Sequence, residues 1–351
     1  MADTAFDSSG GWPGVLGVLT SGGDLAGSVA EAAMAEILAG DATPAQIAAF
    51  MVALRMKGET VSELGGLVDA MLTVAATVPL DEPDATMDVV GTGGDRAHTI
   101  NVSTITAFVV AGAGAKVCKH GNRAASSSCG AADVLEALGV AIDLDPRGVA
   151  RCVAEAGMGF CFAPRFHPAF RHAGPPRREL GIATSFNVLG PMTNPGRVRR
   201  HLIGLADASM AERMLGVLAA RGSHRAMVVH GDDGLDEVTT TTTTTVTELR
   251  DGAVSTWTLD PAEFGIAPAA PDDLRGADAA VNAAAARAVL GGERGRHRDI
   301  VAINAAVALV VADLADTVAD GYALASDVLD DGRAAAVLDR LVSVSNGAAG
   351  N

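Results

Sequence analysis

Three polar segments of the sequence carry residues that could bind phosphate groups and a metal ion. They are DVVGTGGDRAHTINVST at 88–104, KHGNRAASSSCGAAD at 119–133 and HGDDGLDEVTTT at 230–241. Glycines let backbone N–H groups approach a ligand closely, lysine and arginine supply positive charge, and carboxylates bind a hard divalent cation. Together these residue types are typical of a site for a phosphorylated substrate.

The first segment predicts an anion-binding turn between a strand and a helix. Its glycines follow the apolar run 87–90 at once, and a helix is expected to begin near Asn101. A helix N-terminus offers free N–H donors and the positive end of its dipole. The glycine spacing fits neither a dinucleotide fingerprint nor a P-loop. Taken alone, the segment is explained as well by a plain strand-to-helix turn.

The second segment repeats the order of strand, polar loop and helix. We expect the strand to end at Cys118 and the helix to begin near Gly130, with positive charge from Lys119 and Arg123 and neutral donors from Asn122, Ser126, Ser127 and Ser128. Loops that follow adjacent parallel strands lie at the same carboxyl edge of a sheet. One molecule with two separated phosphate groups could therefore bridge both loops.

The third segment offers four acids, which are Asp232, Asp233, Asp236 and Glu237. An acidic loop by itself usually faces solvent. Carboxylates beside phosphates repel them unless a cation lies between, and Mg²⁺ commonly joins carboxylates to substrate phosphates. Because two anion-binding loops precede it, the segment predicts a Mg²⁺ site.

Composition excludes several classes of protein. The chain has 351 residues, a formal net charge of −16, 49% hydrophobic and 3% aromatic residues. A strongly acidic surface repels nucleic acid and anionic membranes. The four cysteines form no CxxC pair and predict buried free thiols. The first residues do not read as a signal peptide, and no apolar run approaches the ~20 residues of a membrane span. We therefore expect a soluble, cytoplasmic protein.

The chain before residue 80 is predicted to be helical. We expect a flexible lead over 1–12 and a small helical domain over 13–80, completed by part of 166–190. Pro44 follows the predicted N-cap Thr43, and Thr60 with Glu63 forms a capping box. A linker at 78–86 separates these helices from residues 81–351, the predicted α/β domain.

After the linker, apolar runs alternate with helical patterns. This alternation predicts an α/β fold with a mainly parallel central sheet, its strands at 87–90, 115–118, 140–144, 159–163, 202–205 and 226–229. The segment at 244–259 is predicted to be a hairpin with an Asp-Gly turn. The seven threonines at 239–245 fit an extended segment, and the chain from Ala277 onward is expected to be helical.

Six ordered motifs resemble the anthranilate phosphoribosyltransferase family, over residues 16–341. They are GTGGD (91–95), N-x-S-T (101–104), KHGNR (119–123), RRELG (177–181), FNVLGPMTNP (186–195) and DGLDE (233–237). The resemblance implies a small helical domain hinged to an α/β domain, and a homodimer formed through the helical domains. It also implies that phosphoribosyl pyrophosphate and Mg²⁺ bind the α/β domain and that anthranilate enters through the interdomain cleft.

The resemblance also assigns residues. Phosphoribosyl pyrophosphate is expected at Gly91, Thr92, Gly94, Asp95, Thr99, Asn101, Val102, Ser103, Thr104, Lys119, His120, Gly121, Asn122, Arg123, Ala124, Ala125, Ser126, Ser127 and Ala131. Mg²⁺ is expected at Ser103, Asp236 and Glu237. Anthranilate is expected at Gly91, Asn122 and Arg177, with His120 and His167 lining the same cleft. No residue is a certain catalytic acid or base, and Asn122, Lys119 and His120 are expected to position the substrates.

Three positions depart from the family pattern. Arg96 stands where the family usually has glycine, and Cys129 and Ala131 replace two serines. These changes weaken single contacts but do not remove the site, because neighbouring donors remain. Two other functions stay open for this fold. One is a pyrimidine nucleoside phosphorylase, which would not need DGLDE as a metal site. The other is a non-enzymatic nucleic-acid-binding protein, which the net charge disfavours.

Overall fold

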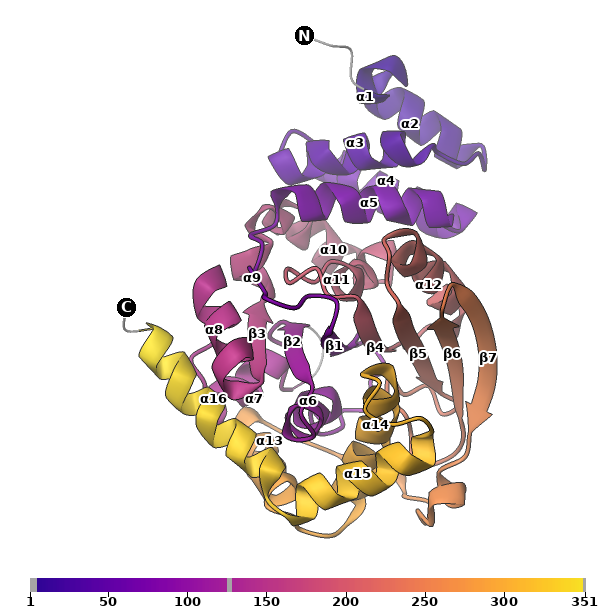
Figure 1. The fold of residues 1–351 in the computed structure, drawn as a ribbon. Coiled ribbons are helices and arrows are strands. Elements are labelled where there is room, and N and C mark those ends of the chain that lie inside the picture. Colours follow the sequence, from indigo (N-terminus) through magenta and orange to yellow (C-terminus); the bar gives the residue numbers. More distant parts are fainter. Residues whose placement is uncertain (1–4, 125–127, 350–351) are drawn as a thin grey trace.

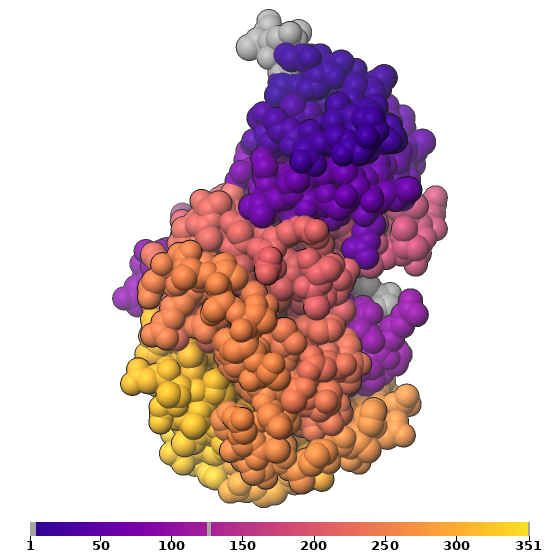
Figure 2. Space-filling view, turned by 90° about the vertical axis from the view of Figure 1, so that its right-hand side faces the viewer, coloured from indigo at the N-terminus to yellow at the C-terminus, as the bar shows by residue number. Residues whose placement is uncertain are grey.

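The chain folds into a helical lobe that sits on a larger α/β body (Figure 1). The computed structural model describes residues 5–124 and 128–349. The lobe contains α1 (Ala5–Ser8), α2 (Gly11–Thr20), α3 (Gly27–Ala39), α4 (Pro44–Lys57) and α5 (Val61–Val74). A space-filling view shows this lobe as the narrower end of the molecule (Figure 2).

The helix starts of α4 and α5 agree with the sequence. Thr43 Oγ1 accepts a hydrogen bond from the N–H of Gln46 at 3.3 Å, directly before Pro44. Thr60 and Glu63 form the predicted capping box, in which Glu63 N donates to Thr60 Oγ1 at 3.1 Å. These reciprocal bonds satisfy N–H groups that the first helical turn leaves free.

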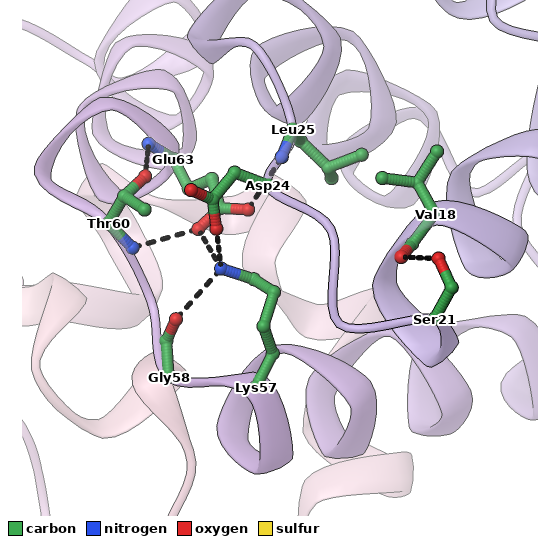
Figure 3. A network of polar contacts seen from close by, with 8 residues as sticks. All are labelled: Val18, Ser21, Asp24, Leu25, Lys57, Gly58, Thr60 and Glu63. Atoms are coloured by element: carbon green, nitrogen blue, oxygen red, sulfur yellow. Dashed lines mark hydrogen bonds and ion pairs between the residues drawn. The ribbon is translucent and has the colours of Figure 1, made fainter.

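A buried polar network joins α4 and α5 (Figure 3). Lys57 Nζ lies 2.9 Å from Glu63 Oε2 and 2.7 Å from Asp24 Oδ1. The other oxygen of Glu63 accepts the N–H of Leu25 at 2.8 Å. Glu63 thus serves both as a helix cap and as the charged partner of Lys57.

The predicted flexible lead over 1–12 is wrong for residues 5–12. Residues 5–8 form α1 and α2 begins at Gly11, while the side chains of Phe6 and Trp12 are buried. Their rings meet edge to face, with centroids 5.4 Å apart, and Trp12 also contacts Phe50. Burial of two aromatic side chains outweighs the polar composition of this segment.

The α/β body is built on a seven-stranded sheet in the order β3-β2-β1-β4-β5-β6-β7. The strands are β1 (Thr86–Gly91), β2 (Lys116–Gly121), β3 (Met158–Phe162), β4 (Arg200–Gly204), β5 (Arg225–Gly231), β6 (Thr244–Arg250) and β7 (Ala253–Leu259). The first five are parallel, and β6 and β7 form the predicted antiparallel hairpin. The prediction of an α/β fold with a mainly parallel sheet is confirmed.

Helices cover both faces of this sheet (Figure 1). They are α6 (Val102–Gly112), α7 (Ala131–Ala137), α8 (Pro146–Ala156), α9 (Ala163–Phe166), α10 (Gly174–Leu180), α11 (Leu189–Met192), α12 (Ala211–Ala220), α13 (Ala279–Leu290), α14 (Arg296–Val311), α15 (Val318–Asp330) and α16 (Arg333–Ala349). Within the described part of the chain, no helix is long and apolar enough to cross a membrane.

Two hydrophobic clusters lie on opposite faces of the sheet. Alternate residues of β1 divide between them, with Val89 in one and Val90 in the other. The cluster containing Val90 also holds Phe50 of α4, together with Ala173 and Phe186. Residues between 166 and 190 therefore pack with the helical lobe. The four cysteines, Cys118, Cys129, Cys152 and Cys161, are buried and form no disulfide, as expected.

One predicted strand and part of one predicted extended segment differ in the structure. Residues 140–144 join no strand, although Val140, Ile142 and Leu144 are buried. Of the threonine run, only Thr244 and Thr245 belong to a strand. In both cases the alternating apolar or β-branched residues correctly indicated buried side chains. The backbone, however, forms hydrogen bonds with groups other than a neighbouring strand; for example, Ala141 N donates to Ser345 Oγ at 3.1 Å.

Candidate active site

The acidic loop after β5 is tied to the glycine loop after β1. Asp236 Oδ2 accepts the backbone N–H of Gly93 at 2.6 Å, and Glu237 Oε1 accepts that of Ser103 at 3.0 Å. Both carboxylates are buried, and Ser103 lies in the first turn of α6. The first and third polar segments of the sequence therefore form one site.

Glycine at position 91 permits this close approach. A Cβ atom there would lie 2.6 Å from Asp236 Oδ2, which no ordinary packing allows. Thr92 fixes the start of the loop, since its N–H donates to Gly204 O at 2.9 Å and its hydroxyl accepts from Ala206 N at 3.2 Å. Gly94 has a φ of 90°, in the left-handed region that favours glycine.

Asp95, Thr99 and Asn101, in the rest of the first segment, each make a contact that fixes the chain. Asp95 Oδ1 accepts the N–H of Ala97 at 3.2 Å, and Thr99 pairs with Arg275 as an isolated bridge. Asn101 Nδ2 donates to Cys129 O at 3.1 Å, which connects the first segment to the second. Val102 and Thr104 are buried in the first turn of α6.

Strand β2 is longer than the sequence predicts. It continues to Gly121, so Lys119, His120 and Gly121 belong to a strand and not to the loop. The reason is the pairing with β3, in which Lys119 lies opposite Phe160 and Gly121 opposite Phe162. The sequence did not indicate this extension, because the residues of KHGNR are mostly polar. Three of the five are nevertheless buried or half-buried strand positions.

Lys119 is a buried cation at the centre of the site, with 1% of its surface exposed. Its Nζ donates to the carbonyl of Val89 and to Ser103 Oγ, the latter at 3.3 Å. Burial lowers the pKa of Lys119, and the carboxylates of Asp88, Glu237 and Asp236 oppose that shift. The ammonium therefore lies among acids that all favour its charged form.

The two acids of the third segment repel each other. Burial raises the pKa of Asp236 well above its ordinary value, and the charge of Glu237 raises it further. Burial raises the pKa of Glu237 to about 7, while Lys119 opposes this. Such a pair is favoured in its ionised form by a divalent cation. Among the described residues, no group of three or more His, Cys, Asp or Glu side chains has metal-binding geometry, so any cation would need oxygen ligands beyond the carboxylates.

The second polar segment is closed by an acid that sequence reasoning missed. Asp133 Oδ2 accepts the N–H groups of Ala124 at 3.0 Å and Gly130 at 2.9 Å. Arg123 Nη1 lies 2.9 Å from Asp133 Oδ1 and 2.5 Å from Glu136 Oε2. The signal in the sequence was the acid three residues after Gly130, the position of a helix cap. The predicted contacts Ala125, Ser126 and Ser127 lie outside the described residues.

Asn122 stands where β2 ends and this loop begins. Its Oδ1 accepts the backbone N–H of Arg123 at 2.7 Å, and its side chain is exposed. Its carbonyl accepts the N–H of Ala132 in the first turn of α7 at 3.1 Å. Its backbone is thus fixed between the strand and the helix, while its side-chain amide stays accessible to a ligand.

Two histidine rings, His120 and His167, lie side by side, and each contacts a backbone carbonyl of the segment FNVLGPMTNP. The ring centroids of His120 and His167 are 5.1 Å apart. His120 Nδ1 lies 3.0 Å from Gly190 O, and His167 Nε2 lies 3.0 Å from Thr193 O. Burial lowers the pKa of His120 to about 3 and that of His167 to about 4. Both rings are therefore neutral near pH 7.

A buried carboxylate and a buried amide, both missed by sequence reasoning, hold this arrangement together. Asp88 Oδ1 accepts a hydrogen bond from the backbone N–H of His120 at 3.1 Å, and Asp88 Oδ2 accepts one from Asn194 Nδ2 at 2.7 Å. The same Nδ2 donates to Cys118 O at 2.7 Å. The sequence feature that could have indicated this role is the position of Asp88 inside the apolar run 87–90, because a buried aspartate normally has a polar partner.

Comparison with known sequences decides the family. Residues 14–75 match the family described as "Glycosyl transferase family, helical bundle domain", and residues 83–335 match "Glycosyl transferase family, a/b domain". The anthranilate phosphoribosyltransferase of Rhodococcus jostii (strain RHA1) is 56% identical over 344 residues, which cover 96% of this chain and 94% of that protein. The chain belongs to the anthranilate phosphoribosyltransferase family.

Other members of the anthranilate phosphoribosyltransferase family agree. The enzyme of Arthrobacter sp. (strain FB24) is 53% identical over 342 residues, covering 96% of each chain. The crystal structure of the Thermus thermophilus enzyme superposes with a TM-score of 0.89 at 37% identity, over 95% of this chain and 99% of that chain. The Saccharomyces cerevisiae enzyme in complex with PRPP and Mg has a TM-score of 0.87 at 27% identity, over 96% and 98%.

Arg177, the residue expected to recognise the second substrate, lies on α10. Its guanidinium stacks 5.4 Å from the ring centroid of Phe170, and burial lowers its pKa. No carboxylate in the described part of the chain lies within salt-bridge distance of it. Its neighbour Arg178 is exposed. A stacked guanidinium without a protein anion is suited to pair with a ligand carboxylate.

The three departures from the anthranilate phosphoribosyltransferase pattern have simple structural settings. Arg96 has a φ of 61°, in the left-handed region where glycine is favoured, and its side chain is exposed. Cys129 is buried, and burial raises the pKa of its thiol to about 11. Ala131 is the first residue of α7, so its backbone N–H is one that the helix itself leaves free.

Proposed function

We propose that the chain transfers the phosphoribosyl group of 5-phosphoribosyl 1-pyrophosphate to the amine of anthranilate. The products are N-(5-phosphoribosyl)anthranilate and pyrophosphate, in the second step of L-tryptophan biosynthesis from chorismate. The observation that carries this proposal is the convergence of the glycine loop, the start of α6 and Lys119 on Asp236 and Glu237. This convergence joins N–H donors, a buried cation and two acids, which a pyrophosphate group with its counter-ion requires.

Catalysis follows from where charge develops. The amine attacks C1 of the ribose while pyrophosphate leaves, and negative charge accumulates on the leaving group. N–H donors at the glycine loop and at the start of α6, together with Lys119, stabilise that charge most in the transition state. These groups are fixed before the reaction because each is anchored to the sheet or to α6.

A general base is not required by this scheme. The aromatic amine of anthranilate is uncharged near pH 7 and already carries a free lone pair. His120 and His167 are buried, neutral rings that we assign to the wall of the substrate cleft. Their proposed contribution is to exclude water and to hold the second substrate. The rate then depends chiefly on holding the amine in line with C1, which is the role we assign to Asn122.

Mg²⁺ is part of the proposal. Asp236, Glu237 and the hydroxyl of Ser103 would hold it, because the two acids lie buried together and their ionised forms repel each other. When bound, the ion neutralises the charge of the pyrophosphate group. A Saccharomyces cerevisiae relative has been crystallised in complex with PRPP and Mg, which supports this assignment.

Anthranilate is assigned to Arg177 on α10. Its guanidinium would pair with the substrate carboxylate, while Gly91 and Asn122 would lie next to the amine. The same resemblance supports a homodimer formed through the helical lobes and a cytoplasmic location. Size-exclusion chromatography with light scattering would test the dimer.

The function is tested by a steady-state assay with two pairs of substrates. Phosphoribosyl pyrophosphate with anthranilate and Mg²⁺ is expected to release pyrophosphate, and thymidine with inorganic phosphate is expected to give no thymine. Turnover of thymidine without turnover of anthranilate would instead identify a pyrimidine nucleoside phosphorylase. Binding of an oligonucleotide without either turnover would identify the non-enzymatic alternative.

A further inference from the structure

A cavity lies apart from the candidate active site, toward the amino ends of β4 and β5. Its volume is about 300 Å³. The walls come from α5 of the helical lobe, from α12 of the α/β body and from the segment that leads into β4. The glycine loop, Lys119 and the two acids of the active site are not among its lining residues, and those groups lie at the carboxyl ends of the strands. Among the residues described above, Asn194, whose side chain donates to Asp88, also lines the cavity.

His201 makes this cavity chemically unusual. Its side chain lines the cavity, only 3% of its surface is exposed, and neither ring nitrogen has a hydrogen-bond partner in good geometry within the described residues. Burial lowers the pKa of His201 to about 4, although the nearby backbone carbonyl of Val198 opposes this shift. The ring is therefore neutral near pH 7, and neither its donor nor its acceptor nitrogen has a partner in good hydrogen-bond geometry within the described residues. Buried polar groups in native proteins normally have partners.

Positive charge is concentrated around the same cavity. Arg197, Arg199 and Arg221 line it, and Asp69 is the single acid among its lining residues. Asp69 already pairs with Arg221, and the exposed carboxylate of Asp84 lies 3.7 Å from Arg199 Nε. Arg197 Nη2 donates to the carbonyl of Leu72 at 2.7 Å and, within the described residues, has no carboxylate in salt-bridge distance. In a chain of formal charge −16, this local excess of arginine attracts an anion.

The remaining wall is apolar. It is formed by buried side chains from α5, α12 and the segment before β4, namely Leu72, Met192, Val198, Val217 and Leu218. A fully hydrated inorganic anion would gain nothing from this wall, whereas a small organic anion would bury its hydrocarbon part against it.

We propose that this cavity is a second ligand site, which binds a small monocarboxylate with a short apolar body. The carboxylate pairs with the guanidinium groups of Arg197 and Arg199, the imidazole of His201 supplies a further hydrogen bond, and the apolar body lies against Leu218 and its neighbours. Because α5 belongs to the helical lobe and α12 to the α/β body, one bound molecule contacts both parts of the protein.

Calorimetric titration with benzoate tests the site. The proposed active site can also bind a carboxylate at Arg177, so all titrations use the full-length Arg177→Ala protein without phosphoribosyl pyrophosphate. We expect one benzoate per chain in this protein. Adding Arg197→Gln or His201→Phe should weaken binding at least about ten-fold, since each removes a partner of the carboxylate. Adding Arg250→Gln, an exposed arginine on the hairpin, should change nothing.

Three other outcomes of these titrations would contradict the proposed site. Unchanged benzoate affinity in the Arg197→Gln protein overturns the proposal even if His201→Phe fails to fold, because Arg197 is exposed and its replacement leaves the core intact. Absence of benzoate binding in the Arg177→Ala protein also overturns it. Binding of inorganic phosphate in place of benzoate shows that the organic-anion assignment is wrong. None of these measurements depends on phosphoribosyl transfer, so they stand whether or not the proposed function holds.

Discussion

The carboxylate of Glu237 accepts a hydrogen bond from the backbone N–H of Ser103 at 3.0 Å, although 134 positions separate the two residues. The bond joins the acidic loop after β5 to the first turn of α6. It places an acid beside a helix N-terminus, where negative charge is stabilised. It also places Glu237 next to a hydroxyl that can share a metal ion with it.

Replacement of both acids tests the metal assignment. We expect Asp236→Asn with Glu237→Gln to lower kcat by orders of magnitude and to abolish the dependence of the rate on Mg²⁺, because the amides cannot hold the cation. The fold should survive, since removing two repelling acids relieves an unfavourable buried pair. Rates measured across a Mg²⁺ titration check this. A double variant with the wild-type Mg²⁺ dependence would remove both residues from the metal site.

Arg177 is predicted to select the carboxylate of anthranilate. Arg177→Ala should raise the KM for anthranilate roughly ten- to a hundred-fold, because a charge-assisted pair contributes about 1.5–3 kcal/mol. The KM for phosphoribosyl pyrophosphate should change little. Arg178→Ala is the matched control, because Arg178 is exposed on the same helix, and its effect should be mild. Equal increases in both KM values for Arg177→Ala would indicate a structural role.

Asn122 and Lys119 are predicted to differ in their effects. Asn122→Ala should raise both KM values and lower kcat, because its amide is proposed to stand between amine and ribose and to align them. Lys119→Ala should mainly weaken binding of phosphoribosyl pyrophosphate. Separate saturation curves for each substrate distinguish the two. A ligand-bound crystal structure in which the loop after β2 lies beyond hydrogen-bonding reach of phosphoribosyl pyrophosphate would contradict this assignment.

The network around Glu63 is predicted to stabilise the helical lobe. Glu63→Gln should lower the free energy of unfolding by about 2 to 4 kcal/mol, because it leaves the ammonium of Lys57 with only the exposed Asp24 as an anionic partner. The control is Glu155→Gln, which breaks the exposed pair with Arg151 and should cost less than about 1 kcal/mol. Urea unfolding followed by circular dichroism measures both. Equal effects would show that burial of the pair is energetically unimportant.

The neutral His201 predicts a pH dependence of stability. Its pKa is about 4 in the folded chain and about 6.5 when unfolded, so the unfolded state binds more protons between these values. Stability attributable to this residue is therefore present above pH 6.5 and is lost as the pH falls toward 4. The loss is at most about 1.4 kcal/mol per pH unit.

Comparison with His201→Phe isolates this contribution. The difference in unfolding free energy between wild type and variant should shift against the wild type by about 3 kcal/mol from pH 6.5 to pH 4. Parallel pH curves for wild type and His201→Phe would show that His201 is protonated in the folded chain.

Much of this protein was determined by local sequence pattern. The capping residues at Thr43 and Thr60 set helix starts, and apolar runs set most strands, because these signals act within a few residues. The sequence also predicted that the glycine loop and the acidic pair belong to one site, and the structure brings the two loops together. The order of six motifs then indicated the family that the comparisons confirmed.

Partners distant in the sequence were decided only by the tertiary structure. The register of β2 with β3 drew Lys119 into a strand, and the fold brought Asp88 to Asn194 across 106 positions. Packing of Trp12 ordered a segment whose composition indicated flexibility. The sequence pattern records whether a side chain prefers to be buried, but a hydrogen bond needs a specific atom at about 3 Å, and which atom arrives there depends on how the whole chain packs.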